Sequence, residues 1–93
     1  MRLYGVKNRR DQNEAAIVEA LRAHGARVDR IAGSGLPDLL VGYQGRWTPL
    51  EVKSAKGSLT ARQARAWTNG QMAYPVVRSV DEALQVVGIP AID

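Results

Sequence analysis

The sequence predicts a small mixed α/β (α+β) domain whose seven elements follow the order α-β-β-β-α-β-α, a small mixed sheet flanked by helices. Two observations lead to this class. Two segments carry helix-capping and helix-stop signals, a third helix is expected near residues 80–88, and four short apolar segments between the helices have strand character. Only Gln44-Gly45 separates the second strand from the third, which is typical of an antiparallel hairpin. The 93 residues suffice for one modest core, so residues 1–93 are expected to form a single domain.

The first helix is predicted from about Asp11 to His24. Asp11 suits the N-cap position, and Gly25 is typical of the left-handed residue that ends a helix. Its apolar stripe consists of Ile17, Val18 and Leu21. Glu14 falls on the face of this stripe, so we expect it either to form a capping box with Asp11 or to belong to an inward-facing functional site.

The second helix is expected to follow Thr60, with Gln63 at the capping-box position, and to end at Gly70. A last helix is expected over residues 80–88. The strands are expected at residues 26–32, 37–43, 46–54 and 74–79. The continuous apolar run of the second strand predicts a central position covered on both faces. Pro49 predicts a bulge or a local gap in the third strand.

The charge is unevenly distributed along the chain. Formal net charge is +4, with +6 over residues 1–70 and −2 over residues 71–93. A basic body favours a polyanionic partner, and nucleic acid fits better than a membrane surface because no helix is both basic and strongly apolar. Charge that serves only solubility stays open as the alternative.

Composition excludes several classes of chemistry. The chain has no cysteine and one histidine, His24, so disulfides, thiolate zinc sites, multi-histidine metal sites and Ser-His-Asp triads are unavailable within one chain. No apolar run reaches the roughly 20 residues of a membrane span, and the first residues lack the apolar core of a signal peptide. We expect a cytoplasmic protein; an origin in a phage or prophage of a bacterial host stays open.

Two isolated carboxylates lie within predicted strands. Between Ser34 and Gly70 the only acids are Asp38 and Glu51. A two-residue turn pairs residues whose numbers sum to 89, which sets Asp38 opposite Glu51, with Lys53 diagonal to Asp38 on the same face. Directly opposed Cβ atoms lie about 4.5–5.5 Å apart, where like charges destabilise a sheet.

A divalent metal would turn this repulsion into binding. Carboxylates on adjacent strands suit Mg²⁺, which keeps several waters and shares the rest of its shell with a phosphate. Lys53 would add positive charge beside the transition state of phosphodiester hydrolysis. The alternative is a surface salt-bridge cluster among Asp38, Glu51 and Lys53, worth about 0–1 kcal/mol per exposed pair.

The same residues resemble a known signature. "PD" at Pro37-Asp38 followed by "EVK" at Glu51-Val52-Lys53 resembles the PD-(D/E)xK nuclease superfamily. The stretches "GSGLPDLLVG", "PLEVKSAKGSLTARQ" and "YPVVRSVDEAL" are similar to the VRR-NUC family, the virus-type replication-repair nucleases. The similarity covers roughly residues 11–87, and the predicted element order is also the core of that superfamily.

The resemblance implies a metal-dependent endonuclease. It implies Mg²⁺, with Mn²⁺ able to substitute, held by Asp38, Glu51 and the Val52 carbonyl. Lys53 would be the catalytic lysine, Glu14 would complete the acidic site, and Gln63 matches a glutamine of many members, while a helix-capping role for Gln63 stays open.

The resemblance also implies partners. Members of about this size resemble homodimeric Holliday-junction resolvases, so DNA four-way junctions and a second copy of the chain are expected, with the alanine-rich second helix as a candidate interface. A nuclease that nicks flaps, ends or duplex is the alternative, and a non-catalytic DNA-binding dimer is one from another class. The expected phosphate contacts are Arg9, Arg10, Lys56, Arg62 and Arg65. Trp47 and Trp67 are expected either to pack in a core or interface or to stack on bases.

Overall fold

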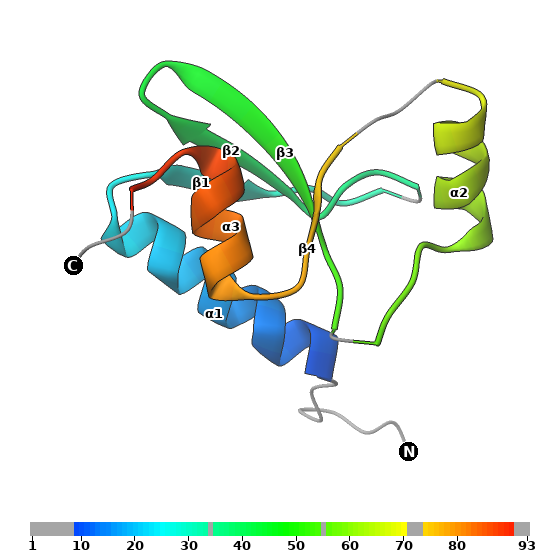
Figure 1. The fold of residues 1–93 in the computed structure, drawn as a ribbon, viewed down its shortest axis with the longest axis horizontal. Helices are drawn as coiled ribbons and strands as arrows, with labels where there is room; N and C mark the ends of the chain where they lie inside the picture. The colour runs from blue at the N-terminus through cyan, green and yellow to red at the C-terminus, as the bar shows by residue number, and fades with distance from the viewer. Residues whose placement is uncertain (1–8, 34, 55, 71–73, 91–93) are drawn as a thin grey trace.

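The predicted order of elements is confirmed in the computed structural model, which describes residues 9–33, 35–54, 56–70 and 74–90. The side chains of residues 9–11 and of Trp67 lie outside this description. The elements are α1 (Arg9–Ala23), β1 (Arg27–Arg30), β2 (Leu39–Tyr43), β3 (Arg46–Val52), α2 (Ala61–Thr68), β4 (Val76–Val77) and α3 (Val80–Val87) (Figure 1).

Helix α1 begins two residues before the predicted start. Because it starts at Arg9, Asp11 lies inside the first turn and is not the N-cap, so the expected capping box of Asp11 with Glu14 is wrong. The predicted end is correct: Gly25 has φ 92°, and the Ala26 N–H returns to the Leu21 carbonyl at 3.1 Å. Such a left-handed residue closes the helix and turns the chain directly into β1.

The four strands described by the structure form one mixed sheet in the order β1-β2-β3-β4. The β1–β2 and β2–β3 pairs are antiparallel, and β3–β4 is parallel. Gln44 (φ 50°) and Gly45 (φ 81°) both adopt positive φ, as a type I′ hairpin turn requires. The predicted register is confirmed from Tyr43–Arg46 through Leu39–Leu50.

Pro49 does not cause the expected bulge. It pairs in register with Leu40. Pairing with β4 starts only at Glu51, where the Glu51 N–H donates to the Pro75 carbonyl at 2.9 Å. The missing N–H of Pro49 therefore falls at a non-hydrogen-bonded position of the hairpin and before β4 begins, so no ladder bond is lost.

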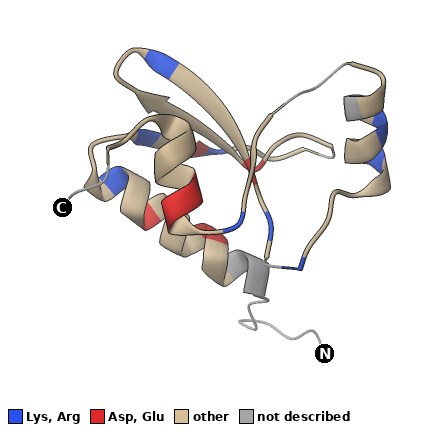
Figure 2. Ribbon diagram, in the orientation of Figure 1, with Lys and Arg blue, Asp and Glu red and all other residues tan. Residues whose placement is uncertain are grey.

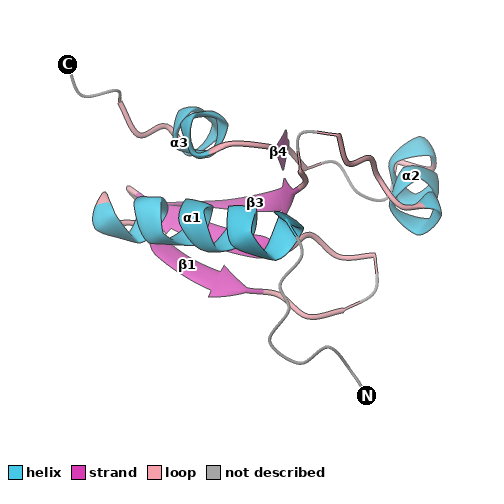
Figure 3. Ribbon diagram, turned by 90° about the horizontal axis from the view of Figure 1, so that it is seen from below, coloured by secondary structure: helices cyan, strands magenta, loops and turns pink. Residues whose placement is uncertain are grey.

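The core lies on one face of the sheet, between the strands and helices α1 and α3 (Figure 3). Leu39 and Val41 of β2 are fully buried against it, together with Leu50 and Val52 of β3. The opposite face is more open: Leu40 and Gly42 are only half-buried. The position of β2 between β1 and β3 is as predicted, but the expectation that it is covered on both faces is wrong.

Helix α2 stands apart from the other two helices, at the far end of the sheet (Figures 1 and 3). Its first turn is fixed by reciprocal bonds between Thr60 and Gln63: the Thr60 N–H donates to Oε1 of Gln63 at 3.0 Å, and the Gln63 N–H donates to Oγ1 of Thr60 at 3.1 Å. The predicted capping box is therefore confirmed. No helix in the described ranges is long and apolar enough to cross a membrane.

Candidate active site

A buried ion pair marks the end of β3. Nζ of Lys53 lies 3.0 Å from Oε2 of Glu51, and the two residues are 7% and 1% exposed. Both side chains leave the strand on the face opposite the apolar core, because strand residues alternate between faces. Removing two charges from water costs free energy. This buried pair is therefore not the exposed salt-bridge cluster that was the alternative interpretation.

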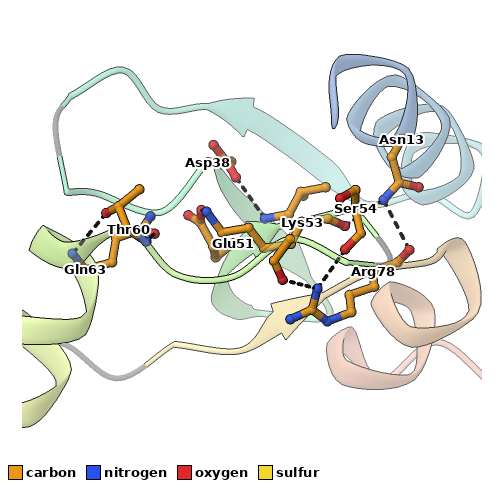
Figure 4. A network of polar contacts seen from close by, with 10 residues as sticks. Asn13, Asp38, Glu51, Lys53, Ser54, Thr60, Gln63 and Arg78 are labelled. Atoms are coloured by element: carbon orange, nitrogen blue, oxygen red, sulfur yellow. Dashed lines mark hydrogen bonds and ion pairs between the residues drawn. The ribbon is translucent and has the colours of Figure 1, made fainter. Parts of the chain in front are cut away.

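Asp38 replaces a ladder bond with its side chain. Its own N–H donates to the Leu50 carbonyl at 3.1 Å, and its Oδ2 accepts the Val52 N–H at 2.8 Å (Figure 4). Backbone pairing of β2 with β3 therefore stops at Leu39–Leu50. The direct pairing of Asp38 with Glu51 is not part of the ladder, because the Asp38 carboxylate takes the Val52 N–H in place of a backbone carbonyl.

The segment that carries the buried pair is held from two sides. The N–H groups of Glu51 and Lys53 donate to the carbonyls of Pro75 (2.9 Å) and Val77 (3.0 Å) in and before β4. The Val52 N–H between them donates to Asp38. N–H and C=O of one strand residue point the same way, so the Val52 carbonyl faces the side on which Asp38 lies.

Asn13 on α1 is a residue that the sequence analysis missed. Its Nδ2 donates to the Lys53 carbonyl at 3.0 Å and to the Arg78 carbonyl at 3.1 Å, joining the ends of β3 and β4 to the helix (Figure 4). A signal was present: Asn13 lies four and eight residues before Ile17 and Leu21, so it is a polar residue on the buried stripe.

Arg78 is the second residue that was missed. Its Nη1 donates to the carbonyls of Ser54 (2.7 Å) and Gly57 (2.6 Å), which fixes the loop that follows Lys53 (Figure 4). Arg78 is the only basic residue from 71 to 93, and this isolation in an acidic segment is the signal that could have found it. Together Asn13 and Arg78 hold the main chain at the catalytic candidate Lys53 and in the loop that follows it.

Glu14 has a different partner. Nε of Arg30 in β1 lies 3.1 Å from Oε2 of Glu14. Within the described ranges no three Asp, Glu, His or Cys side chains are close enough to hold a metal ion together, so the structure does not join Glu14 to Asp38 and Glu51. Its metal-site role stays a prediction.

Of the predicted DNA-contact residues, Lys56 lies in the loop after β3, and Arg62 and Arg65 lie on α2. Lys56, Arg62 and Arg65 are exposed, and α2 carries no acid (Figure 2). Arg62 also contacts the loop before β2, because a Cβ added to Gly35 would meet its Cδ at 2.9 Å. The side chains of Arg9, Arg10 and Trp67 lie outside the described part of the chain.

The donor set suits a hard divalent cation. Asp38 and Glu51 supply carboxylates, and the Val52 carbonyl supplies a third oxygen on the side of Asp38. Mg²⁺ takes one or two carboxylates and keeps several waters, so two carboxylates without Glu14 are enough. Gln63 is buried (5% exposed) and its Oε1 caps α2, so the capping role is confirmed while a catalytic one stays a prediction.

The fold is similar to that of a solved structure described as a "VRR_NUC domain". The TM-score is 0.68, and the match covers 87% of this chain and 96% of the other chain at 24% sequence identity. No protein-family model and no curated protein matches the chain. At this identity the likeness confirms the fold that the sequence resemblance implied, and the activity is argued from the site.

Proposed function

We propose that the protein is a metal-dependent endodeoxyribonuclease that hydrolyses phosphodiester bonds in branched DNA. The observation that carries this proposal is the buried pair of Glu51 and Lys53 at 3.0 Å, beside a carboxylate, Asp38, that is oriented by the Val52 N–H. The likeness to a VRR_NUC domain supports the same reading.

The energetics of the pair favour a functional reason for it. Replacing a buried ion pair by apolar residues of similar volume is often neutral or stabilising by about 1–4 kcal/mol. Apolar side chains already occupy neighbouring positions of the same strand, where Leu50 and Val52 are fully buried. A fold that needed only stability would gain nothing from a carboxylate and an ammonium here, whereas phosphodiester hydrolysis uses both.

Each residue has a distinct task. Asp38, Glu51 and the Val52 carbonyl would hold Mg²⁺, or Mn²⁺ in its place. A bound Mg²⁺ supplies Lewis-acid polarisation of the phosphoryl oxygen and acidifies a water. Lys53 supplies fixed positive charge where the phosphorus centre gains negative charge, and this costs no reorganisation because its main chain is held in advance by Asn13.

Within this nuclease activity, the specific role that we propose is that of a homodimeric Holliday-junction resolvase. A four-way junction is resolved by cuts in two strands related by an approximate two-fold axis, and a C₂ dimer sets two identical sites in that relation. Helix α2 supports this because it is amphipathic and stands apart from the other two helices.

A nicking assay tests the proposal. Labelled four-way junction, flap, linear duplex and single strand are incubated with the wild type in Mg²⁺, in Mn²⁺ and in EDTA. We expect metal-dependent cuts, fastest in the junction and paired symmetrically. Asp38→Asn should abolish them, while Glu19→Gln, which neutralises an exposed carboxylate on α1, should not. No cleavage of any DNA in either metal would contradict the nuclease, and flap or duplex cleavage alone would contradict the resolvase.

A further inference from the structure

Trp47 is exposed on the sheet face that carries the buried pair. It is 55% exposed, more than the other exposed large apolar residues of the described part, Leu36 and Val86. Trp47 and Glu51 of β3 share one face with Lys53, which follows the strand directly, because strand side chains alternate. The indole therefore lies outside the core, in line with the candidate active site.

The indole is held flat against the sheet. A Cβ added to Gly42, its partner across β2, would lie 3.0, 3.2 and 3.3 Å from three successive ring carbons of Trp47. Nearly equal distances to neighbouring carbons place the ring face, and not its edge, over Gly42. One face of the indole thus covers the glycine, and the side chain as a whole remains 55% exposed.

Arg27 of β1 lies close to the Trp47 ring. Its Cζ lies 5.9 Å from the ring centroid, and its Nε donates to Oδ2 of Asp29 at 2.9 Å. Asp29 thereby holds the guanidinium beside the ring. A guanidinium has five N–H donors, so the pair with Asp29 leaves donors for a phosphate.

A flat aromatic face beside a guanidinium suits a nucleotide. Bases stack on exposed aromatic rings with little dependence on sequence, and the guanidinium can contact the phosphate. A base within a duplex is already covered by its neighbours on both sides. The ring can therefore stack only on a base with an open face, such as an unpaired base at a branch point or a frayed end.

We propose that Trp47, supported by Gly42 and Arg27, stacks on an unpaired base of the DNA strand that is cut at Lys53. This rests on the proposed nuclease function and specifies its substrate. Trp47 and Glu51 are four residues apart, or about 13 Å along a strand at roughly 3.3 Å per residue. That distance spans about four nucleotides at 3.4 Å each, so branched DNA with unpaired nucleotides about that far from the cut is the preferred substrate.

Binding without metal tests the stacking separately from cleavage. Two four-way junctions are compared, one fully paired and one with two unpaired thymidines at the branch, along with linear duplex. We expect Trp47→Ala to weaken binding of the unpaired junction about 5- to 150-fold and to leave duplex binding unchanged. Trp47→Tyr should restore most of the affinity. Val86→Ala, which trims an exposed apolar residue on α3, should change nothing.

A second variant moves the ring without removing it. Gly42→Ala sets a Cβ 3.0 Å from the indole, so the ring must shift and affinity for the unpaired junction should fall. Equal binding by Trp47→Ala and wild type would overturn the inference. Equal losses on all three DNAs would also overturn it, and conversion of a dimer to a monomer would overturn it and assign the ring to a protein interface. Failure of the wild type to cut any DNA in Mg²⁺ would instead overturn the proposed function.

Discussion

Lys53 and Glu51 show how a strand can carry charge into a nearly buried place. The neighbouring Val52 is fully buried in the core, so the strand cannot rotate to expose Glu51 and Lys53. The N–H groups of these three residues are all bonded, to Pro75, Asp38 and Val77. The geometry of the charged groups is therefore set by the backbone before any ligand binds.

Metal binding should stabilise the fold. Mg²⁺ held by Asp38 and Glu51 binds only the native state, so at a hundred times its Kd it should add about 2.7 kcal/mol to the free energy of unfolding. Asp38→Asn should remove this gain and keep the fold, because the amide oxygen can still accept the Val52 N–H. Denaturant melts with and without Mg²⁺ measure it, with Glu19→Gln as the control. A wild-type curve unmoved by saturating metal would contradict the metal site.

At the scale of elements, the loop after β3 depends on one arginine. Arg78 reaches from the segment between β4 and α3 to the carbonyls of Ser54 and Gly57. Helix α3 begins immediately afterwards, where Oγ of Ser79 accepts the Glu82 N–H at 3.1 Å. The start of α3 and the loop beside Lys53 are thus fixed by adjacent residues.

Arg78 is expected to act as a positioning residue. Arg78→Ala should lower the cleavage rate about 10- to 100-fold, as losses of supporting contacts around metal sites do, with little change in KM. Hydrogen bonds to charged groups contribute about 1.5–3 kcal/mol, so unfolding should also become easier. Arg22→Ala removes another arginine-to-carbonyl bond, at 2.8 Å to Val28 and away from the site, and should leave the rate unchanged. Equal rate losses in both variants would indicate a general effect on stability.

The elements could be predicted because their signals are local. Gln44-Gly45 determines the hairpin, and Thr60 with Gln63 determines the start of α2. The features that the sequence did not predict are contacts between residues far apart in the chain. Asp38 leaves the ladder to bond Val52, and Asn13 bonds a carbonyl forty residues away. Bonds to main-chain carbonyls depend on tertiary packing more than on residue type, so spacing predicted the charged residues of the site but not what holds them.

At the scale of the whole molecule, basic and acidic residues are concentrated in different parts of the chain. Residues 1–70 carry net +6 and residues 71–93 carry −2. Basic residues lie on α2, whereas acidic residues lie on α3 (Figure 2). DNA is therefore expected to approach from the α2 end of the sheet, near Arg62 and Arg65, and away from α3.

The protein is expected to be a homodimer that uses α2 as its interface. Ala64 is exposed on this helix, and Ala64→Glu should dissociate the dimer, because it buries an unpaired charge. Sedimentation equilibrium measures the mass, and Val86→Glu on α3 adds the same charge elsewhere as the control. A monomer that still makes paired symmetric cuts in a junction would contradict this assembly.

The most direct test of the active site separates binding from cutting in Lys53→Ala. Affinity for a four-way junction is measured without metal at several salt concentrations, and cleavage is measured in Mg²⁺ with all DNA bound. We predict nearly unchanged affinity, because one lost phosphate contact alters the salt slope by only about 1, together with a loss of cleavage by orders of magnitude. Parallel losses of affinity and cleavage would show that Lys53 only holds phosphate, and would contradict the catalytic role assigned to its buried pair with Glu51.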